Sequence, residues 1–235
     1  ALLSCYGIPQ SMISINEYGG PRLDRAPVYE KLNFDYALDS IANSAGTVTV
    51  NYSQSINTVE LRFRTDNVIT NPSISSNMNL FNVGSNAVTL KYTSGTLGKI
   101  QINGTGSANI EMFDGGWINM MLKTSGANLQ VVAARSKYGK IVAEVSASAT
   151  ASFADSGSVV LGSTSTGYTR LKAELQELRL WSSSLDTSYF ENHTKAPAAY
   201  NSADPYNDLV FRLPLTQKIN HTLTSSLTGV QPKLS

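Results

Sequence analysis

Two pairs of carboxylates are the first candidates for catalytic side chains. Glu174 and Glu177 lie three residues apart, and Asp35 and Asp39 lie four apart. Glycoside hydrolysis with retention needs two carboxyl groups about 5–5.5 Å apart. Glu174 and Glu177 would point to opposite faces of a regular strand, and Asp35 and Asp39 share a face but fall at the edge of the patterned region. We interpret all four as solvated carboxylates and assign no catalytic residue.

Motifs for metals, nucleophiles and dinucleotides are missing from the sequence. The two histidines, His193 and His221, lie in polar stretches, and the chain has no HExxH motif, cysteine cluster or EF-hand loop. Residues 162–167 have the wrong spacing for a nucleophile elbow. Residues 104–106 (GTG) lack the third glycine of a dinucleotide site. We predict no metal, no cofactor and no enzymatic activity.

Exposed aromatic side chains on loops are the candidates for ligand binding. Sugar sites combine aromatic platforms with amide or acid side chains. Tyr138 in the basic turn 135–140, Tyr168 and Tyr18 fit this description, but each is also typical of a solvated turn. The sequence therefore does not fix a ligand-binding residue. Two tryptophans adjoin large apolar side chains and are predicted to be core residues: Trp117 and Trp181.

The stretch 171–190 carries the strongest structural signal. Leu178 and Leu180 fall on one face of an extended chain, while Glu177 and Arg179 fall on the other, which predicts a half-buried strand.

A short helix is predicted directly after this strand. Asp186 can cap a helix that begins at Thr187. Leu185, just before the cap, has the right offset to pack on Phe190 as a hydrophobic staple.

Period-2 alternation dominates the chain from residue 47 onward. Apolar and polar residues alternate in further segments, joined by Gly, Asn, Ser and Thr. These half-buried segments are 48–52, 59–64, 88–92, 100–102, 110–112, 118–122, 129–133 and 141–145. Such strands at short, even spacing predict an all-β fold, an antiparallel jelly-roll β-sandwich with one short helix and extended terminal arms.

Several of these pieces resemble laminin G-like (LamG) domains, which have a concanavalin A-like fold. The family's closing strand commonly reads G-x-L-x-E-L-R-L-W-x-x-x-L, and the matching residues here are Leu175, Glu177, Leu178, Arg179, Leu180, Trp181 and Leu185. Residues 114–117 (DGGW) resemble the turn and tryptophan of the family's central hairpin, and residues 159–162 (VVLG) resemble the short strand before the closing one. The resemblance covers residues 36–195 and implies a concanavalin A-like sandwich.

The resemblance bears on two possible sites. Many relatives carry a histidine soon after that tryptophan, whereas this chain has Ile118 and Asn119, so a role of that histidine does not carry over. Some LamG domains bind calcium at one rim, which would involve Asp66 and Asp114. Calcium takes about six to eight oxygen ligands, and no concentrated set is present. We favour ordinary turn residues at both positions.

Composition limits the partners. The formal net charge is +1 and 15% of the residues are charged, so no global field attracts nucleic acid or an anionic membrane. No apolar run approaches the roughly 20 residues that span a bilayer. Cys5 is the single cysteine, so no internal disulfide is possible. We predict no nucleic-acid partner and no membrane insertion.

Three regions are expected along the chain. Residues 1–35 carry turn signals and little periodicity, which indicates an N-terminal extended arm. Residues 36–200 are expected to form the LamG-like sandwich. Residues 201–235 are expected to be a linker and strand that lead to a neighbouring domain or subunit. The chain reads as a piece of a longer polypeptide.

The segment 208–215 (DLVFRLPL) resembles linkers that follow LamG-like modules in large bacteriophage virion proteins. This resemblance implies a non-enzymatic structural or adhesion module of a virion tail, neck or capsid fibre. Its expected partners are other assembly proteins, further copies of the chain and a host glycan. The alternative is a secreted lectin or glycan-hydrolase-like domain, extracellular or at a cell surface, which requires a groove lined by aromatic and acidic side chains.

Overall fold

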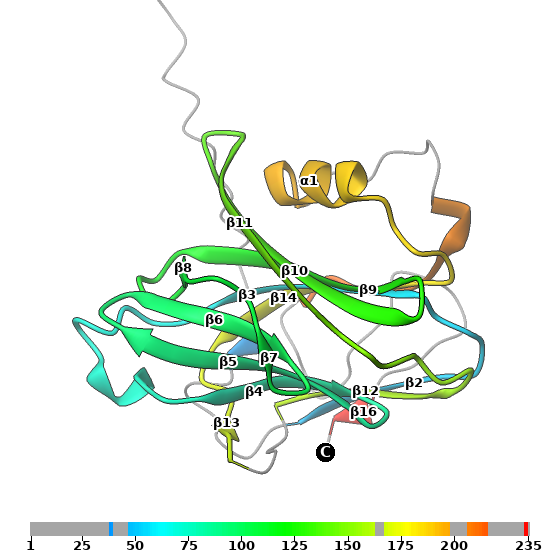
Figure 1. The fold of residues 1–235 in the computed structure, drawn as a ribbon, viewed down its shortest axis with the longest axis horizontal. Coiled ribbons are helices and arrows are strands. Elements are labelled where there is room, and N and C mark those ends of the chain that lie inside the picture. Colours follow the sequence, from blue (N-terminus) through cyan, green and yellow to red (C-terminus); the bar gives the residue numbers. More distant parts are fainter. Residues whose placement is uncertain (1–37, 40–46, 163–166, 198–205, 216–232, 235) are drawn as a thin grey trace, which may run out of the picture. The chain divides into compact units, whose positions relative to one another are not determined.

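The computed structural model describes residues 38–39, 47–162, 167–197, 206–215 and 233–234. Within these ranges the chain forms two β-sheets that pack face to face, with one α-helix outside them (Figure 1). The predicted all-β jelly-roll sandwich with one short helix is confirmed. The arm expected at 1–35 lies outside the described residues, as do Tyr18, Asp35 and His221.

Sheet A is antiparallel throughout and has seven strands in the described chain. Its order is β1 (Leu38–Asp39), β14 (Glu174–Trp181), β3 (Thr58–Arg64), β9 (Trp117–Ser125), β10 (Asn128–Lys137) and β11 (Lys140–Ala149). The seventh, β15 (Leu209–Leu213), pairs with the second half of β14. The strand expected within 201–235 is therefore found in β15, where it extends this sheet.

Sheet B has nine strands in the described chain. The order is β16 (Lys233–Leu234), β2 (Val48–Tyr52), β12 (Gly157–Leu161), β4 (Met78–Val83), β5 (Asn86–Ser94), β6 (Leu97–Ile102) and β7 (Thr105–Gly106). Two short strands are added: β8 (Ile110–Glu111) pairs antiparallel with β6, and β13 (Thr169–Arg170) pairs parallel with β4. Two 3-10 turns, Pro72–Ile74 and Tyr206–Asp208, complete the described elements.

Strand β4 was not predicted, and a bulge explains why. The register with β5 shifts between Asn79 and Phe81, so Leu80 and Phe81 are both buried although they are adjacent. A bulge breaks the strict alternation by which a strand is recognised in a sequence.

The core lies between the two sheets. Inward side chains of sheet A, such as Leu61 and Phe63, pack in one cluster with those of sheet B, such as Val88 and Leu90. All four are at most 2% exposed. Burying a side chain of this size contributes roughly 1.5–3 kcal/mol, so this layer dominates the stability of the sandwich.

The prediction that β3 and β14 are half-buried is wrong. Their outward side chains are buried as well: Glu60 is 4% exposed, and Arg62 and Arg179 are each 2% exposed. The reason is a second layer on the outer face of sheet A, formed by α1 (Thr187–Lys195) and the residues after it. Figure 1 shows α1 on the outer side of β9 and β10.

Helix α1 begins as predicted. The Ser188 backbone N–H donates to Oδ1 of Asp186 at 2.8 Å, which makes Asp186 the N-cap. Leu185 and Phe190 are buried in one apolar cluster on the outer face of sheet A, together with Met121, Val132, Ala134, Trp181 and Leu209. The staple therefore presses the helix onto the sheet. Neither α1 nor the 3-10 turns of the described chain are long and apolar enough to cross a membrane.

Candidate functional site

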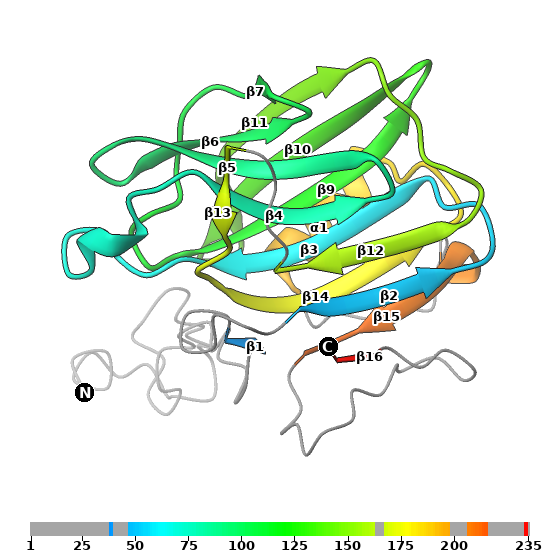
Figure 2. The ribbon, with the colours of Figure 1, turned by 90° about the horizontal axis from the view of Figure 1, so that it is seen from below.

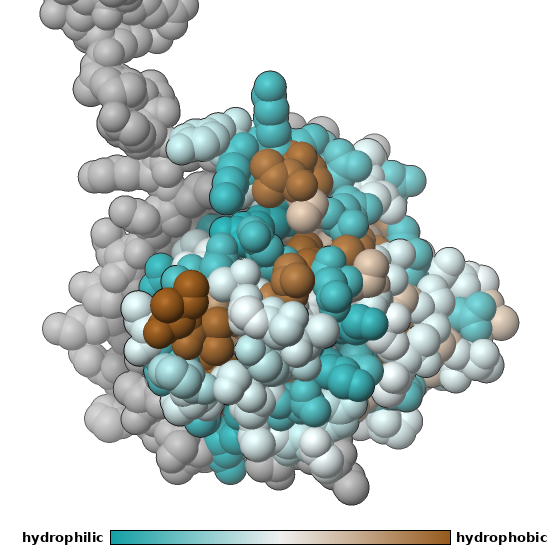
Figure 3. All heavy atoms as spheres, turned by 60° about the vertical axis from the view of Figure 1, so that its left-hand side comes forward, coloured by the Kyte–Doolittle hydropathy of each residue, from teal (hydrophilic) through white to brown (hydrophobic). Residues whose placement is uncertain are grey.

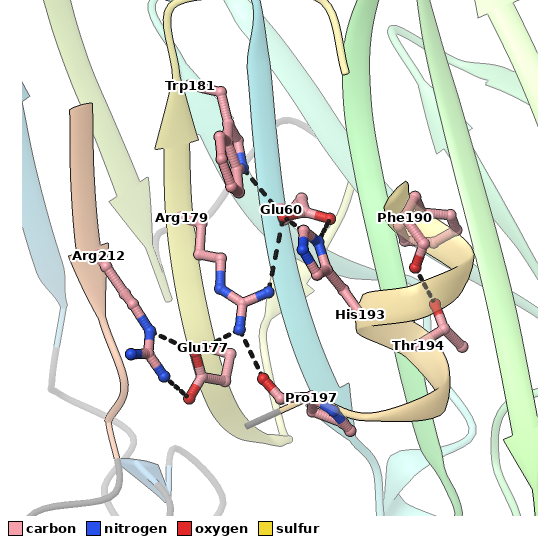
Figure 4. A network of polar contacts seen from close by, with 9 residues as sticks. All are labelled: Glu60, Glu177, Arg179, Trp181, Phe190, His193, Thr194, Pro197 and Arg212. Atoms are coloured by element: carbon pink, nitrogen blue, oxygen red, sulfur yellow. Dashed lines mark hydrogen bonds and ion pairs between the residues drawn. The ribbon is translucent and has the colours of Figure 1, made fainter. Parts of the chain in front are cut away.

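Ionisable side chains gather on the outer face of sheet A, where α1 covers it (Figure 4). Glu60 comes from β3, Glu177 and Arg179 from β14, His193 from α1, and Arg212 from β15. The first four are at most 7% exposed. We call these five residues, with Trp181, the buried network.

Glu60 contacts Trp181, His193 and Arg179 in the buried network. Trp181 Nε1 donates to Glu60 Oε2 at 2.9 Å, and His193 Nδ1 lies 3.0 Å from Oε1. The Trp181 and His193 rings are stacked, with their centroids 5.7 Å apart and an angle of 12° between their planes. Arg179 Nη1 adds a longer ion pair to Glu60 at 3.8 Å. The carboxylate therefore links β14 to the helix.

Glu177 is the second carboxylate of the network, and it accepts from Arg212 and Arg179. Arg212 donates to it through Nε at 3.0 Å and Nη2 at 2.9 Å, and Arg179 Nη2 donates at 3.0 Å. A two-bonded guanidinium and carboxylate pair is the strong geometry for such contacts. Arg179 Nη2 also donates to the Pro197 carbonyl at 2.5 Å. Glu177 thereby ties β15 to β14, and Arg179 ties the segment after the helix to the same strand.

A bulge in β14 brings Glu177 to this position. The register with β3 shifts between Gln176 and Arg179, and Glu177 has a φ of 51°. A non-glycine residue in that region costs roughly 1–3 kcal/mol. The Glu177 N–H donates to the Pro214 carbonyl at 3.0 Å, which holds the bulge against the end of β15.

Because of this bulge, two predictions about carboxylates are wrong. Glu174 pairs with Arg64 on the outer face, with Nη2 and Oε2 at 2.5 Å, and Glu177 lies on that outer face too. The prediction of opposite faces is wrong because an extra residue interrupts the alternation. The solvated reading is also wrong for Glu177, which is 4% exposed. Asp39 lies in β1, with its side chain outside the described part, and Asp35 lies wholly outside it.

Arg62 extends the network toward Trp117. Its Nη1 donates to Gln176 Oε1 at 3.0 Å, and its guanidinium lies 4.4 Å from the Trp117 ring centroid. Burial lowers the pKa of Arg62 to about 10, Glu177 opposes that change and Arg64 adds to it. The guanidinium stays protonated at neutral pH. Trp117 is half-buried, whereas Trp181 is fully buried as predicted.

The buried network has the residue types of a catalytic site but no room for a substrate. The cavity lined by Glu60, Glu177 and His193 has a volume of about 10 Å³. That is close to the space for a single water molecule. Each carboxylate is also occupied by cationic or N–H donors. The arrangement is suited to clamping α1 and β15 onto sheet A.

The tyrosines singled out in the sequence lie in different surroundings. Tyr138, at the tip of the β10–β11 hairpin, is 83% exposed and has a φ of 52°. Tyr168 donates through its hydroxyl to Gln101 Oε1 at 3.0 Å on sheet B. Tyr138 extends from a hairpin of sheet A and Tyr168 is bonded to sheet B, and neither lines the cavity beneath α1.

The aspartates considered for calcium are held by other side chains. Asn71 Nδ2 donates to Asp66 at 3.1 Å, and Arg135 Nη2 lies 2.7 Å from Asp114. Asp114 also accepts from the Gly116 N–H at 3.0 Å, which is the turn geometry expected of it. Across the part of the chain that the structure describes, no group of three or more His, Cys, Asp or Glu side chains could hold a metal.

A cleft opens on the flank of the sandwich, between the edges of the two sheets. Its volume is about 260 Å³. Figure 2 shows β2 and β15, which border it, at that flank. The residues that line it are Asn51, Tyr52, Ser53, Gln54, Leu180, Val210 and Phe211. We call this the flank cleft.

The flank cleft is lined by polar residues on one side and by apolar residues on the other. Asn51, Ser53 and Gln54 are exposed side chains at or just past the end of β2. Leu180 and Phe211 are fully buried on the other side. Tyr52 is 6% exposed, and burial raises the pKa of its hydroxyl, so this group is neutral. None of the described lining residues is charged, which distinguishes this cleft from the buried network.

Sequence reasoning missed both regions. Alternation assigns Glu60, Arg179 and Arg212 to the solvent side of their strands. The available signal for a covering element was the staple of Leu185 and Phe190, which predicts a helix packed next to β14. Asn51 and Gln54 carry no signal of their own, because the cleft depends on how two sheet edges that are distant in sequence meet.

No protein-family model matches the sequence, and no curated protein matches it. Among solved structures, the fold is similar to a putative carbohydrate binding protein from Bacteroides ovatus ATCC 8483, with a TM-score of 0.51 and 10% identity. That match covers 81% of this chain and 56% of the other.

Two further solved structures are less similar. One is the native heptameric SAP-like pentraxin from Limulus polyphemus, with a TM-score of 0.40, 15% identity, and coverage of 63% of this chain and 75% of that one. The other is the enzymatically active domain of the bacteriophage CBA120 tailspike protein 2, with a TM-score of 0.49, 13% identity, and coverage of 73% and 29%. This chain thus spans just over half of the Bacteroides protein and under a third of the tailspike. At these identities the similarity concerns the fold alone: the chain folds as a jelly-roll β-sandwich.

Proposed function

We propose that this chain is a non-enzymatic, LamG-like binding module that contacts glycans as part of a larger assembly, such as a bacteriophage virion. In this proposal residues 36–200 together with strand β15 form the module, and the rest of the flanking regions 1–35 and 201–235 joins it to neighbouring proteins or further copies of the chain. The resemblance of the closing strand to LamG domains and of 208–215 to virion linkers supports the assignment.

One observation carries the non-enzymatic part of the proposal. The two buried carboxylates, Glu60 and Glu177, are saturated by donors and face a cavity of about 10 Å³. A glycoside hydrolase must bring two carboxyl groups to either side of a sugar ring. The flank cleft offers more room, about 260 Å³, and none of its described lining side chains can act as a general acid or base at neutral pH.

A second candidate role is contact with a partner protein. The large hydrophobic side chains that are exposed in the described chain are Ile69, Tyr138 and Val142. Tyr138 and Val142 belong to the same β10–β11 hairpin, and β11 is the edge strand of sheet A. Figure 3 shows that hydrophobic side chains form small separate patches on an otherwise mostly polar face. An edge strand with such side chains is suited to packing in an assembly.

A glycan array that carries both neutral and acidic glycans tests the proposal. We expect saturable binding to a defined set of glycans. Mass spectrometry of the eluted glycans should then show their masses unchanged after long incubation. Cleaved products would favour the hydrolase alternative, and no binding to any glycan would contradict glycan contact.

A further inference from the structure

We infer that the flank cleft is the glycan site and that it takes a single uncharged sugar ring. This inference rests on the proposed function and adds the position of the site and the class of sugar. It starts from the residues of the cleft, which combine three exposed amide or hydroxyl side chains with an apolar floor.

The size of the cleft limits the ligand. Sites for drug-sized molecules have volumes of about 300–1,000 Å³, and the flank cleft measures about 260 Å³. It therefore holds a small compound or one residue of a longer chain. The cleft lies on the flank of the sandwich, so a glycan can place one ring inside and continue into solvent.

The lining matches the two kinds of surface on a sugar. The C–H groups of a pyranose ring need an apolar surface, which the half-buried Val210 can provide; Leu180 and Phe211 also line the cleft but are fully buried. The ring hydroxyls need donors and acceptors, and Asn51 and Gln54 each offer a carbonyl oxygen and an NH₂ group. These amides are exposed, so a bound hydroxyl can reach them without repacking of the core.

Charge excludes the acidic sugars. None of the described residues that line the cleft is cationic, so a carboxylate or sulfate that entered it would lose its hydration without gaining a partner among them. The chain as a whole carries a formal charge of +1 and offers no compensating field. The cleft thus favours neutral sugars over sialic or uronic acids.

The test uses the full chain and the glycan array described above. The double variant Asn51→Ala/Gln54→Ala removes both amides, and Asn109→Ala is the matched control, because Asn109 is an exposed amide beside β8, at the far side of sheet B. We expect wild type to bind neutral glycans and the double variant to bind them at least about tenfold more weakly, since two hydrogen-bonding groups are lost. The control should bind as wild type does, and all three should show the same unfolding temperature.

The outcomes separate this inference from the proposed function. If wild type binds glycans and the double variant binds them equally well, the cleft is not the site, although the proposed function stands. Binding confined to sialylated or uronic-acid glycans would also overturn the inference alone. If wild type binds no glycan, the proposed function fails first.

Discussion

The buried network and the flank cleft are built from neighbouring residues of the same two strands. Arg179 and Arg212 point outward into the network, while Leu180 and Phe211, next to them in β14 and β15, point inward and reach the cleft. Successive side chains of a strand alternate between faces. One strand pair can therefore hold a saturated charge cluster on one face and a neutral cleft on the other.

Charged residues therefore do not by themselves mark a reactive site. The network has carboxylates, a histidine and arginines but almost no free volume. The cleft has free volume but no charged side chain among the described residues that line it. We therefore expect substitutions in the network to change stability, and substitutions in the cleft to change binding.

The largest effect on stability is expected from Glu177→Gln. The change keeps the shape of the side chain but leaves Arg179 and Arg212 without their shared carboxylate, and Arg179 is 2% exposed. Removing one partner of a buried ion pair costs about 3–5 kcal/mol. Urea unfolding followed by circular dichroism measures the difference in the free energy of unfolding.

Glu174→Gln is the matched control for that variant. The Glu174 and Arg64 side chains are 23% and 39% exposed, so their ion pair is screened by water. A loss of about 1 kcal/mol or less is expected. Equal losses for the two variants would contradict the clamping role of Glu177.

A smaller loss is expected from Trp181→Phe. The phenyl ring keeps most of the contact with His193 and the apolar cluster but cannot donate to Glu60. A hydrogen bond to a charged group contributes roughly 1.5–3 kcal/mol. Thermal and urea unfolding of the purified variant measure the change. Wild-type stability would mean that Glu60 does not depend on this donor.

The helix cap gives a pH-dependent effect. The hydrogen bond from the Ser188 backbone N–H holds the pKa of the Asp186 carboxyl below its ordinary value. A lowered folded-state pKa means that the stabilisation is present above the unfolded-state pKa of about 3.9 and is lost as the pH falls through the folded-state value. We expect the stability difference between wild type and Asp186→Asn, measured by urea unfolding, to shrink between pH 7 and about pH 3. A difference that does not change with pH would show that the charge of the cap contributes nothing.

The smallest effect on stability is expected in the cleft. Asn51 and Gln54 are exposed, and exposed substitutions usually change stability by about 0.5 kcal/mol or less. The Asn51→Ala/Gln54→Ala variant should unfold at the wild-type urea concentration while it loses glycan binding. A large loss of stability would mean that the cleft is part of the supporting framework.

Much of the fold could be predicted because its signals are local. Alternation marks β2, β3 and β5, and the sequence from Leu185 to Phe190 encodes the staple that starts α1. The bulges are different, because they interrupt the alternation: β4 was missed, and Glu177 was placed on the wrong face.

The candidate sites could not be predicted, because they depend on contacts between distant segments. The network joins Glu60 to His193, which is 133 residues away along the chain. Whether a charge on a strand faces water or a covering helix depends on where that helix docks. The flank cleft depends likewise on how the edge of β2 lies against β15.

A crystal structure of the chain soaked with the neutral sugar that binds best tests the central claim most directly. We predict sugar density in the flank cleft, with ring hydroxyls within hydrogen-bond distance of Asn51 and Gln54. No density is expected beside Glu60 and Glu177. A sugar bound between those two carboxylates would show that the buried network opens and can act on a substrate, which contradicts the account.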